Sequence, residues 1–240
     1  MRNTDSDWNA IGLSDPYYGV ITDEKFRREN MDAEKRAEFF ASGKADIDFV
    51  LSKVPVGIHM REALDFGCGV GRLSLALTSH FEAVTGVDVS EGMLNEARSN
   101  AASDNIRNVA FVNRIPDKAF DLITSYIVFQ HIPPAKGMDI FRTLLSRVKI
   151  GGAIAIQMIF YRLVKHTDQV ARDHALVSYD GETLKSRSRR YLDTPNQMMM
   201  YDYDATDVLV ALFEAGFPEF TITKTDHGSI GAWVFAKRVT

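Results

Sequence analysis

The stretch from residue 63 to residue 77 constrains the fold more than any other part of the chain. An apolar run that contains Asp65 is followed by Gly67-Cys68-Gly69-Val70-Gly71 and then by leucines at helical spacing. This order predicts a buried strand, a tight glycine turn and a helix packed against a sheet. Glycine adopts backbone angles that other residues avoid, and its missing Cβ lets a ligand lie against the main chain. We therefore expect a ligand-binding turn at the carboxyl edge of an α/β sheet.

Two acidic residues are placed to meet a ligand at this edge. Asp65 lies at the end of the first strand, where its carboxylate suits a cation such as an amino group. Asp88 ends the next apolar run, residues 84–87, where its oxygens can accept both hydroxyls of a ribose. A dinucleotide-binding turn needs G-x-G-x-x-G so that a pyrophosphate meets the helix N-terminus, whereas this turn reads G-x-G-x-G. The spacing therefore argues against NAD.

Several motifs in chain order closely resemble those of the class I S-adenosylmethionine-dependent methyltransferases. They comprise residues 64–71, 86–94, 120–125 and 129–133 and the pair Gly151-Gly152, so the resemblance covers roughly residues 63–157. It implies a Rossmann-like α/β fold with a mostly parallel seven-stranded sheet, an antiparallel last strand and helices on both faces. It also implies S-adenosyl-L-methionine as the cofactor, S-adenosyl-L-homocysteine as the product, and transfer of a methyl group to oxygen or nitrogen of a small molecule.

The family's motifs can be carried over to this chain residue by residue. In the family, the glycine turn holds the methionine part of the cofactor and the second acid holds the ribose. Met93 is either a core methionine or the apolar side of the adenine slot, and Cys68 in such a turn is more often packing than a nucleophile. The residues predicted to contact the cofactor are Asp65, Gly67, Cys68, Gly69, Gly71, Asp88, Val89, Met93, Asn113, Ile115, Ser125 and Tyr126.

The chain departs from the family pattern after the third predicted strand, residues 109–112. Members of the family usually carry an acid there that touches the adenine amino group, whereas this chain has Asn113 and reaches Phe120-Asp121 almost at once. The side-chain oxygen of Asn113 can accept from that amino group, and Ile115 can cover the ring.

His131 is the candidate for acid–base chemistry. The ordinary pKa of histidine lies near neutrality, so His131 can take a proton from a hydroxyl or an amine; the alternative is a histidine that orders the loop by bonding to main chain. A sulfonium methyl group is already activated, and the protein then mainly supplies orientation and a dry pocket. The residues predicted to line the acceptor site are Tyr17, Tyr18, His131, Tyr161 and Arg162.

Two parts of the chain fall outside the motifs. Residues 1–54 are expected to form an N-terminal lid and helices, and residues 55–240 the methyltransferase domain with a cap-like insertion at about 160–203. The aromatic start of the chain fits a lid over the cofactor or a tail that covers the core edge. Gly43 is expected to end one helix and separate it from a second. The basic cluster at residues 187–190 either binds an anionic group of the substrate or forms a solvated surface.

Composition restricts the partners and leaves a second function open. The formal net charge is -4 and the isoelectric point is near 5.9, which argues against nucleic acid as the substrate. A single cysteine, no signal peptide, no membrane-length apolar run and scattered histidines predict a cytoplasmic protein with no membrane or metal site. The alternative function is an S-adenosylmethionine-binding sensor or partner subunit without transferase activity, and a homodimer is compatible with either function.

Overall fold

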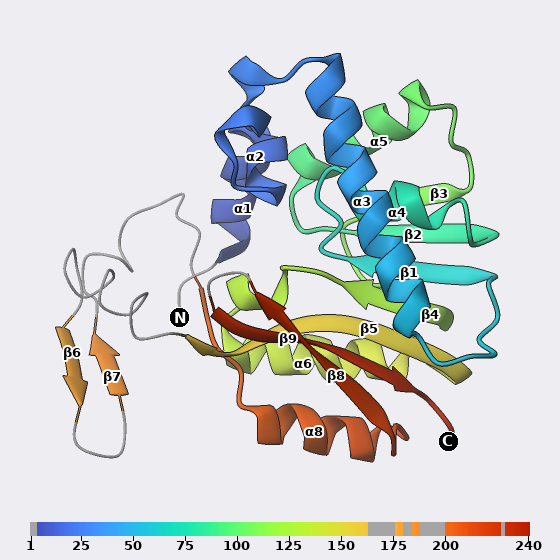
Figure 1. The fold of residues 1–240 in the computed structure, drawn as a ribbon, viewed down its shortest axis with the longest axis vertical. Coiled ribbons are helices and arrows are strands. Elements are labelled where there is room, and N and C mark those ends of the chain that lie inside the picture. Colours follow the sequence, from blue (N-terminus) through green and yellow to red (C-terminus); the bar gives the residue numbers. More distant parts are fainter. Residues whose placement is uncertain (1–3, 163–175, 180–183, 188–199, 227–228) are drawn as a thin grey trace.

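The computed structural model describes residues 4–162, 176–179, 184–187, 200–226 and 229–240, which are drawn in colour in Figure 1. At its centre lies a seven-stranded sheet in the order β3-β2-β1-β4-β5-β9-β8. The first five strands run parallel, and β9 is antiparallel to both of its neighbours, so the predicted sheet is confirmed. The strands are β1 (Glu62–Phe66), β2 (Ala83–Val87), β3 (Val109–Val112), β4 (Phe120–Ser125), β5 (Val148–Arg162), β8 (Phe220–Asp226) and β9 (Ser229–Lys237).

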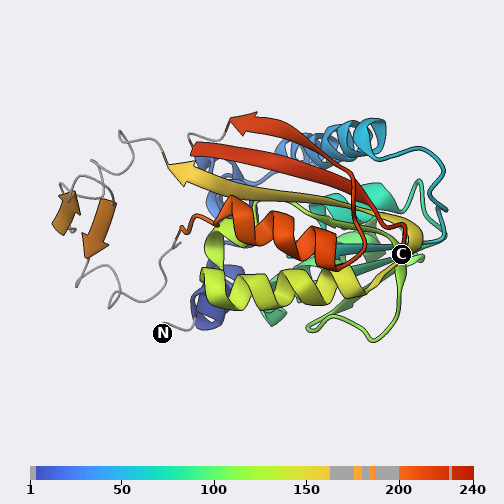
Figure 2. The ribbon, with the colours of Figure 1, turned by 90° about the horizontal axis from the view of Figure 1, so that it is seen from below.

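Helices cover both faces of this sheet. One face carries α3, α4 and α5, and the other carries α6 and α8, which lie side by side (Figure 2). Their bounds are α3 (Ala33–Lys53), α4 (Arg72–Leu77), α5 (Glu91–Ser103), α6 (Pro134–Ser146) and α8 (Ala205–Glu214).

The strands are apolar on both faces because both faces are covered. Leu122 of β4 packs toward α3 and α4, whereas its neighbour Ile123 packs toward α6 and α8. Side chains alternate along a strand, so a sheet that is buried on both faces needs apolar residues at successive positions. This explains the consecutive apolar residues Leu122 and Ile123 in β4 and the apolar run at residues 153–156 in β5.

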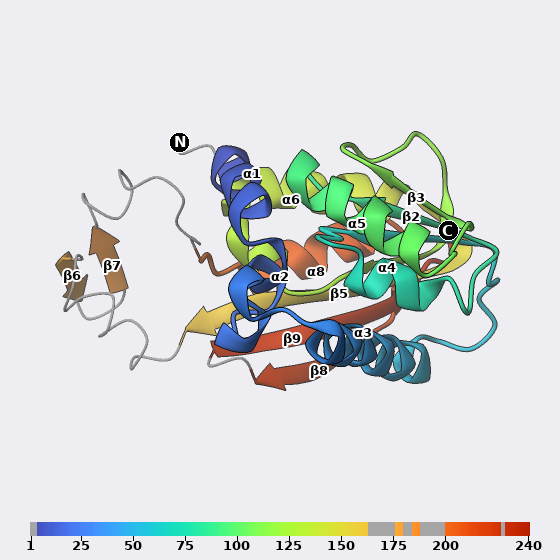
Figure 3. The same cartoon turned by 90° about the horizontal axis from the view of Figure 1, so that it is seen from above.

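The start of the chain folds across the carboxyl ends of the central strands (Figure 3). It forms α1 (Thr4–Ser14), α2 (Pro16–Val20) and two turns of 3-10 helix, η1 (Glu24–Phe26) and η2 (Arg28–Asn30). Asp15 bonds the side chain of Arg27 and the backbone N–H of Arg28, so this segment is tied to itself as well as to the domain. We call α1 and α2 the lid below; that they open and close over a cofactor stays a prediction.

The expectation that Gly43 ends a helix was wrong. Residues 33–53 form one continuous helix, α3, with Asp32 as its N-cap accepting from the backbone N–H of Lys35. Gly43 lies in the middle of α3 because a Cβ there would collide with the backbone carbonyl of Arg72. The glycine therefore serves a close approach between α3 and the start of α4, a role that helix propensity cannot reveal.

The predicted insertion at about 160–203 lies largely outside the described residues. Within it, β6 (Leu176–Tyr179) and β7 (Leu184–Arg187) pair as an antiparallel two-stranded sheet. Tyr161 and Arg162 end strand β5, but their side chains lie outside the described part, as do residues 188–190 of the basic cluster. Among the helices that are described, none is long and apolar enough to cross a membrane.

Candidate active site

The glycine turn between β1 and α4 is built on backbone angles that favour glycine. Gly67, Gly69 and Gly71 have φ values of 76°, 52° and 89°, all in the left-handed region. The N–H groups of Gly67 and Cys68 both donate to the carbonyl of Val87, at 2.7 and 3.0 Å. The turn is thereby held against the end of β2, the strand that leads to Asp88.

Two valine side chains lie directly on this turn. A Cβ added at Gly67 would overlap Val128, which follows β4, and a Cβ at Gly69 would lie 2.5 Å from Cγ2 of Val20 in α2. The missing Cβ atoms are therefore needed in the structure as it stands. Any ligand laid against Gly69 must share that space with Val20, so access to the turn depends on the position of α2.

Asp88 connects the turn to the helix that follows β2. Its Oδ2 accepts from the backbone N–H of Gly69 and its Oδ1 from that of Ser90, both at 2.9 Å. Burial raises the pKa of the Asp88 carboxyl, and the N–H groups of Ser90 and Gly69 oppose that rise. A carboxylate has about four acceptor positions, and the backbone N–H of Val89 acts on this one as well, so Asp88 keeps room for a further donor such as a hydroxyl.

Asp65 is more deeply buried than the sequence suggested. Asp65 is 1% exposed, and its Oδ2 accepts a hydrogen bond from the hydroxyl of Ser74 in α4, at 2.6 Å. Burial raises the pKa of Asp65 to about 6, against the opposing effects of the Ser74 hydroxyl and the charge of Arg72. The bond to Ser74 fastens α4 to the end of β1.

Arg72 and Ser74, at the start of α4, are buried polar residues beside the turn that sequence reasoning missed. Arg72 is buried, and its guanidinium bonds the side chains of Asp46 and Ser42 in α3 while lying 5.8 Å from the ring centre of Tyr126. The sequence does show that Arg72 and Ser74 are polar residues among the apolar residues of α4, which could have drawn attention to them. Their partners could not be identified from the run itself.

The lid formed by α1 and α2 packs on α5 and on the loop after β4. Gly12 lies against Ser90 and Met93, and a Cβ at Gly19 would lie 2.8 Å from the terminal methyl of Met93. Met93 is fully buried under the lid, in a cluster with Tyr17 and Val70. This placement fits the core interpretation of Met93 as well as a wall of the adjoining site.

The two lid tyrosines have different surroundings. The hydroxyl of Tyr17 lies 2.9 Å from Oε1 of Glu96 and 2.8 Å from Oδ1 of Asn100, both in α5. Burial and the bond to Glu96 raise the pKa of Tyr17 to about 12. Tyr18 lies beneath the guanidinium of Arg27, 3.5 Å from the ring centre. Tyr17 therefore secures the lid to α5, and Tyr18 stabilises the lid internally.

The segment after β4 brings the remaining predicted residues to the same edge of the sheet. The hydroxyl of Ser125 donates to the carbonyl of Phe66, and Tyr126 stacks on Trp233 with ring centres 4.7 Å apart. His131 is 8% exposed and lies in η3 (Phe129–His131), where Trp8 of the lid meets its ring edge-on at 5.0 Å. The lid thus covers the candidate base.

The other predicted cofactor residues surround this edge at different depths. Val89 and Asn113 are exposed, and Ile115 is half-buried against the core cluster that contains Phe141. Cys68 is buried, and burial raises the pKa of its thiol, which keeps the sulfur protonated and unreactive. The packing interpretation of Cys68 agrees with this environment.

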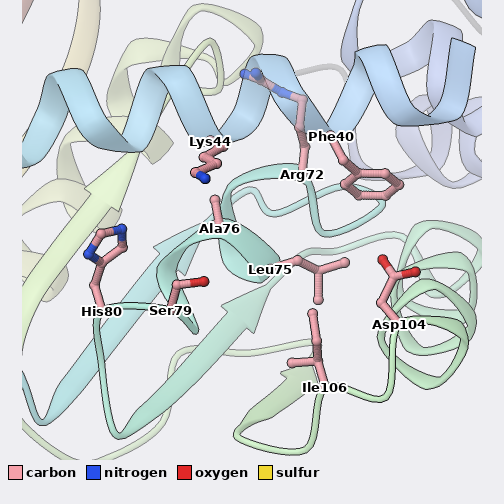
Figure 4. Close-up of a pocket in the computed structure, with 9 residues that line it drawn as sticks. All are labelled: Phe40, Lys44, Arg72, Leu75, Ala76, Ser79, His80, Asp104 and Ile106. Atoms are coloured by element: carbon pink, nitrogen blue, oxygen red, sulfur yellow. The ribbon is translucent and has the colours of Figure 1, made fainter. Parts of the chain in front are cut away.

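A shallow pocket of about 210 Å³ lies elsewhere, between α3 and α4 (Figure 4). It is lined by residues such as Phe40, Lys44 and His80, and none of the residues predicted for the site takes part. Arg72 borders it, but the guanidinium extends toward α3, where its bonds to Asp46 and Ser42 are made (Figure 4). Among the described residues, no three His, Cys, Asp or Glu side chains are grouped to hold a metal ion.

The strand order and the glycine turn together define the Rossmann-like fold of class I methyltransferases. Residues 63–152 match the family described as "Methyltransferase domain". The solved structure of magnesium protoporphyrin IX methyltransferase from Synechocystis PCC 6803, which has SAH bound, is similar in fold. Its TM-score is 0.59 at 17% sequence identity, over 85% of this chain and 84% of that one.

Curated relatives are similar over part of the chain. The trans-aconitate 2-methyltransferase of Rhizobium rhizogenes is 31% identical over 111 residues, which are 45% of this chain and 42% of the relative. The ubiquinone biosynthesis O-methyltransferase of Coxiella burnetii is 30% identical over 105 residues, 41% of this chain and 44% of the relative. The matches thus span less than half the length of either relative.

Proposed function

We propose that this protein is an S-adenosylmethionine-dependent methyltransferase that modifies oxygen or nitrogen of a small molecule. The observation that carries the proposal is the junction at Asp88, whose carboxylate joins the glycine turn at Gly69 to the start of α5 at Ser90. This junction presents an acceptor for hydroxyls beside a main chain without Cβ atoms. The matched methyltransferase domain supports the same conclusion.

The residues present fit the cofactor in their chemistry. The remaining acceptor capacity of Asp88 suits a ribose hydroxyl. Gly67 and Gly69 offer the methionine part a main chain without Cβ atoms, on which Val128 and Val20 now lie. Val20 must move away from Gly69 as the cofactor enters, so the lid opens and recloses in each cycle. Bound S-adenosylmethionine supplies a sulfonium methyl group open to in-line attack, so the protein needs no nucleophile of its own.

His131 is the proposed proton acceptor on the substrate side. Its Nε2 lies 3.1 Å from the side-chain nitrogen of Gln130, and an amide nitrogen can only donate. With the amide in this orientation, Nε2 accepts and the neutral ring carries its proton on Nδ1. A hydroxyl or amine acceptor would lose its proton to Nε2 of His131 once that nitrogen exchanges its bond to Gln130 for one to the acceptor. Trp8 meanwhile excludes water from the imidazole.

The acceptor site is proposed to lie between the lid and the segment after β4. Tyr17 and Tyr18 come from the lid and His131 from the facing loop, and Tyr161 and Arg162 would complete the site from the end of β5. Two relatives are named for methylation of trans-aconitate and for O-methylation in ubiquinone biosynthesis, which makes small acids and phenols the first acceptors to try. A cytoplasmic location and a homodimer stay predictions.

The first test is calorimetric titration of the protein with S-adenosylmethionine, S-adenosylhomocysteine and NAD. The proposal requires binding of the first two and no binding of NAD. A screen with radiolabelled S-adenosylmethionine against small acids, phenols and amines then identifies the acceptor. Binding without transfer to any compound would favour the alternative of a sensor or partner subunit, and no binding would overturn both.

A further inference from the structure

Ile127, directly after β4, has a backbone conformation that its side chain disfavours. Its φ is 59°, and among the described residues only Asn105 is a second non-glycine residue with positive φ. Asparagine tolerates this region, whereas a β-branched residue there is a clear outlier. Such a conformation persists only where the surrounding structure holds it in place, and it is typical of functional sites.

The side chain of Gln157 holds this conformation. Its Oε1 accepts the backbone N–H of Ile127 at 3.2 Å, across from β5 to the loop after β4. Gln157 is fully buried within the apolar part of β5, where an amide without a partner would be costly. Its nitrogen has only long contacts, at 3.5 Å, with the Thr225 hydroxyl and the Met158 carbonyl. The bond to Ile127 is thus the best one this amide makes.

The neighbouring strands leave room for the amide. A Cβ at Gly231 of β9 would lie 2.8 Å from the nitrogen of Gln157 and 2.7 Å from the hydroxyl of Thr225 in β8. Three strands therefore contribute to one small polar pocket inside the sheet layer. This arrangement is more than a chance contact of one glutamine with a loop.

The residues on either side of Ile127 meet the glycine turn. Val128 lies on Gly67, with its Cβ 2.9 Å from the position of an added Cβ, and Ser125 donates to the carbonyl of Phe66. The positive φ at Ile127 thus lies between two contacts that this segment makes with the turn. The segment 125–128 is thereby set against the part of the turn where the methionine half of the cofactor would lie.

We propose that Gln157 is a positioning residue that fixes the segment 125–128 against the glycine turn by bonding the backbone of Ile127. This inference rests on the proposed function. Gln157 would affect binding of the methionine half of the cofactor, because it holds the main chain that lies against that half. The adenosine half, which the Asp88 side of the turn would hold, should not depend on it.

The test compares two ligands in the Gln157→Met variant, which keeps the volume of the side chain but removes its acceptor. By calorimetry, the affinity for S-adenosylmethionine should fall at least tenfold. The affinity for 5′-methylthioadenosine, which lacks the amino-acid part, should change less than threefold. A general loss of structure would weaken both ligands equally, and an equal or absent change would overturn the proposal.

Two further variants distinguish a positioning role of Gln157 from a general loss of structure. Thr225→Val removes the other side-chain contact of the Gln157 amide and should leave both affinities within threefold of wild type. Adding Ile127→Gly to Gln157→Met should recover most of the lost affinity, because glycine adopts the positive φ without help. A double variant as weak as Gln157→Met would contradict the proposal.

The wild-type protein provides a measurement that needs no variant. The Ile127 amide should exchange its hydrogen slowly in the free protein, since it is bonded to a buried oxygen, and rapid exchange would refute the inference even if Gln157→Met fails to fold. If wild type binds neither ligand, the proposed function has failed, and the inference fails with it. If wild type and Gln157→Met bind S-adenosylmethionine equally tightly, the inference about Gln157 is wrong but the proposed function stands.

Discussion

The glycine turn and the lid face each other across the candidate site, but they are built in different ways. The turn is held by main-chain groups, such as the N–H of Gly69 on Asp88 and those of Gly67 and Cys68 on Val87. The lid is held by side chains, such as Tyr17 on α5 and Val20 on the turn. A site made of backbone tolerates few substitutions, whereas a cover held by side chains can loosen without unfolding the domain.

The strongest test of this difference is Gly67→Ala. The new methyl group would meet Val128 and would also sit at a positive φ, so we expect a loss of about 3 kcal/mol in the free energy of unfolding. Urea denaturation measures it. Gly57→Ala is the matched control, because Gly57 has a φ of 85° but its nearest neighbour, Nζ of Lys237, is 3.6 Å away. That control should cost about 1 kcal/mol; similar losses in both variants would show that packing on the turn matters little.

The buried acid of the turn predicts a pH dependence. Because burial raises the pKa of Asp65 to about 6, the folded protein binds a proton more tightly than the unfolded chain, whose pKa is near 3.8. The contribution of Asp65 to stability is therefore favourable below pH 4 and is lost as the pH rises through 6. Relative to Asp65→Asn, wild type should lose on the order of 2 kcal/mol between pH 4 and 7. Urea titrations of both proteins at each pH measure the free energy of unfolding. If that free energy changed with pH in the same way in both proteins, the pKa of Asp65 would not be raised.

Replacement of the second acid should affect binding more than folding. Asp88→Asn keeps one carbonyl acceptor for the backbone but loses the charge and an acceptor for a ribose hydroxyl. We expect the affinity for S-adenosylmethionine to fall by about 2 kcal/mol, roughly thirtyfold. Calorimetry measures the change, with Asp104→Asn, an exposed acid just after α5, as the control. Unchanged affinity would remove Asp88 from the ribose site.

The smallest effect is expected in the lid. Tyr17→Phe removes the hydroxyl that lies between Glu96 and Asn100 and should cost about 1 kcal/mol, with faster hydrogen exchange confined to α1 and α2. Tyr18→Phe keeps the ring beneath Arg27 and should leave exchange unchanged. If Tyr17→Phe instead unfolds the whole domain cooperatively, the lid is part of the core and the contrast with the turn is wrong.

Much of the fold was accessible from local pattern. The apolar runs that flank the glycine turn predicted β1 and β2, and the three glycines indicated the left-handed turn that is observed. Gly43 shows where this reasoning fails, because a glycine in a helical pattern reads as a stop. Its reason for being there is the carbonyl of Arg72, which lies twenty-nine residues further along the chain.

The sequence by itself determined the class of fold and predicted a place for the candidate site, since strand periodicity and the angles open to glycine are properties of short stretches. Only the tertiary structure decided the partners: Ser74 for Asp65, Glu96 for Tyr17, and Gln157 for the backbone of Ile127. The last two pairs are separated by 79 and 30 residues. Contacts over such distances depend on how whole layers pack, and no local pattern records that packing.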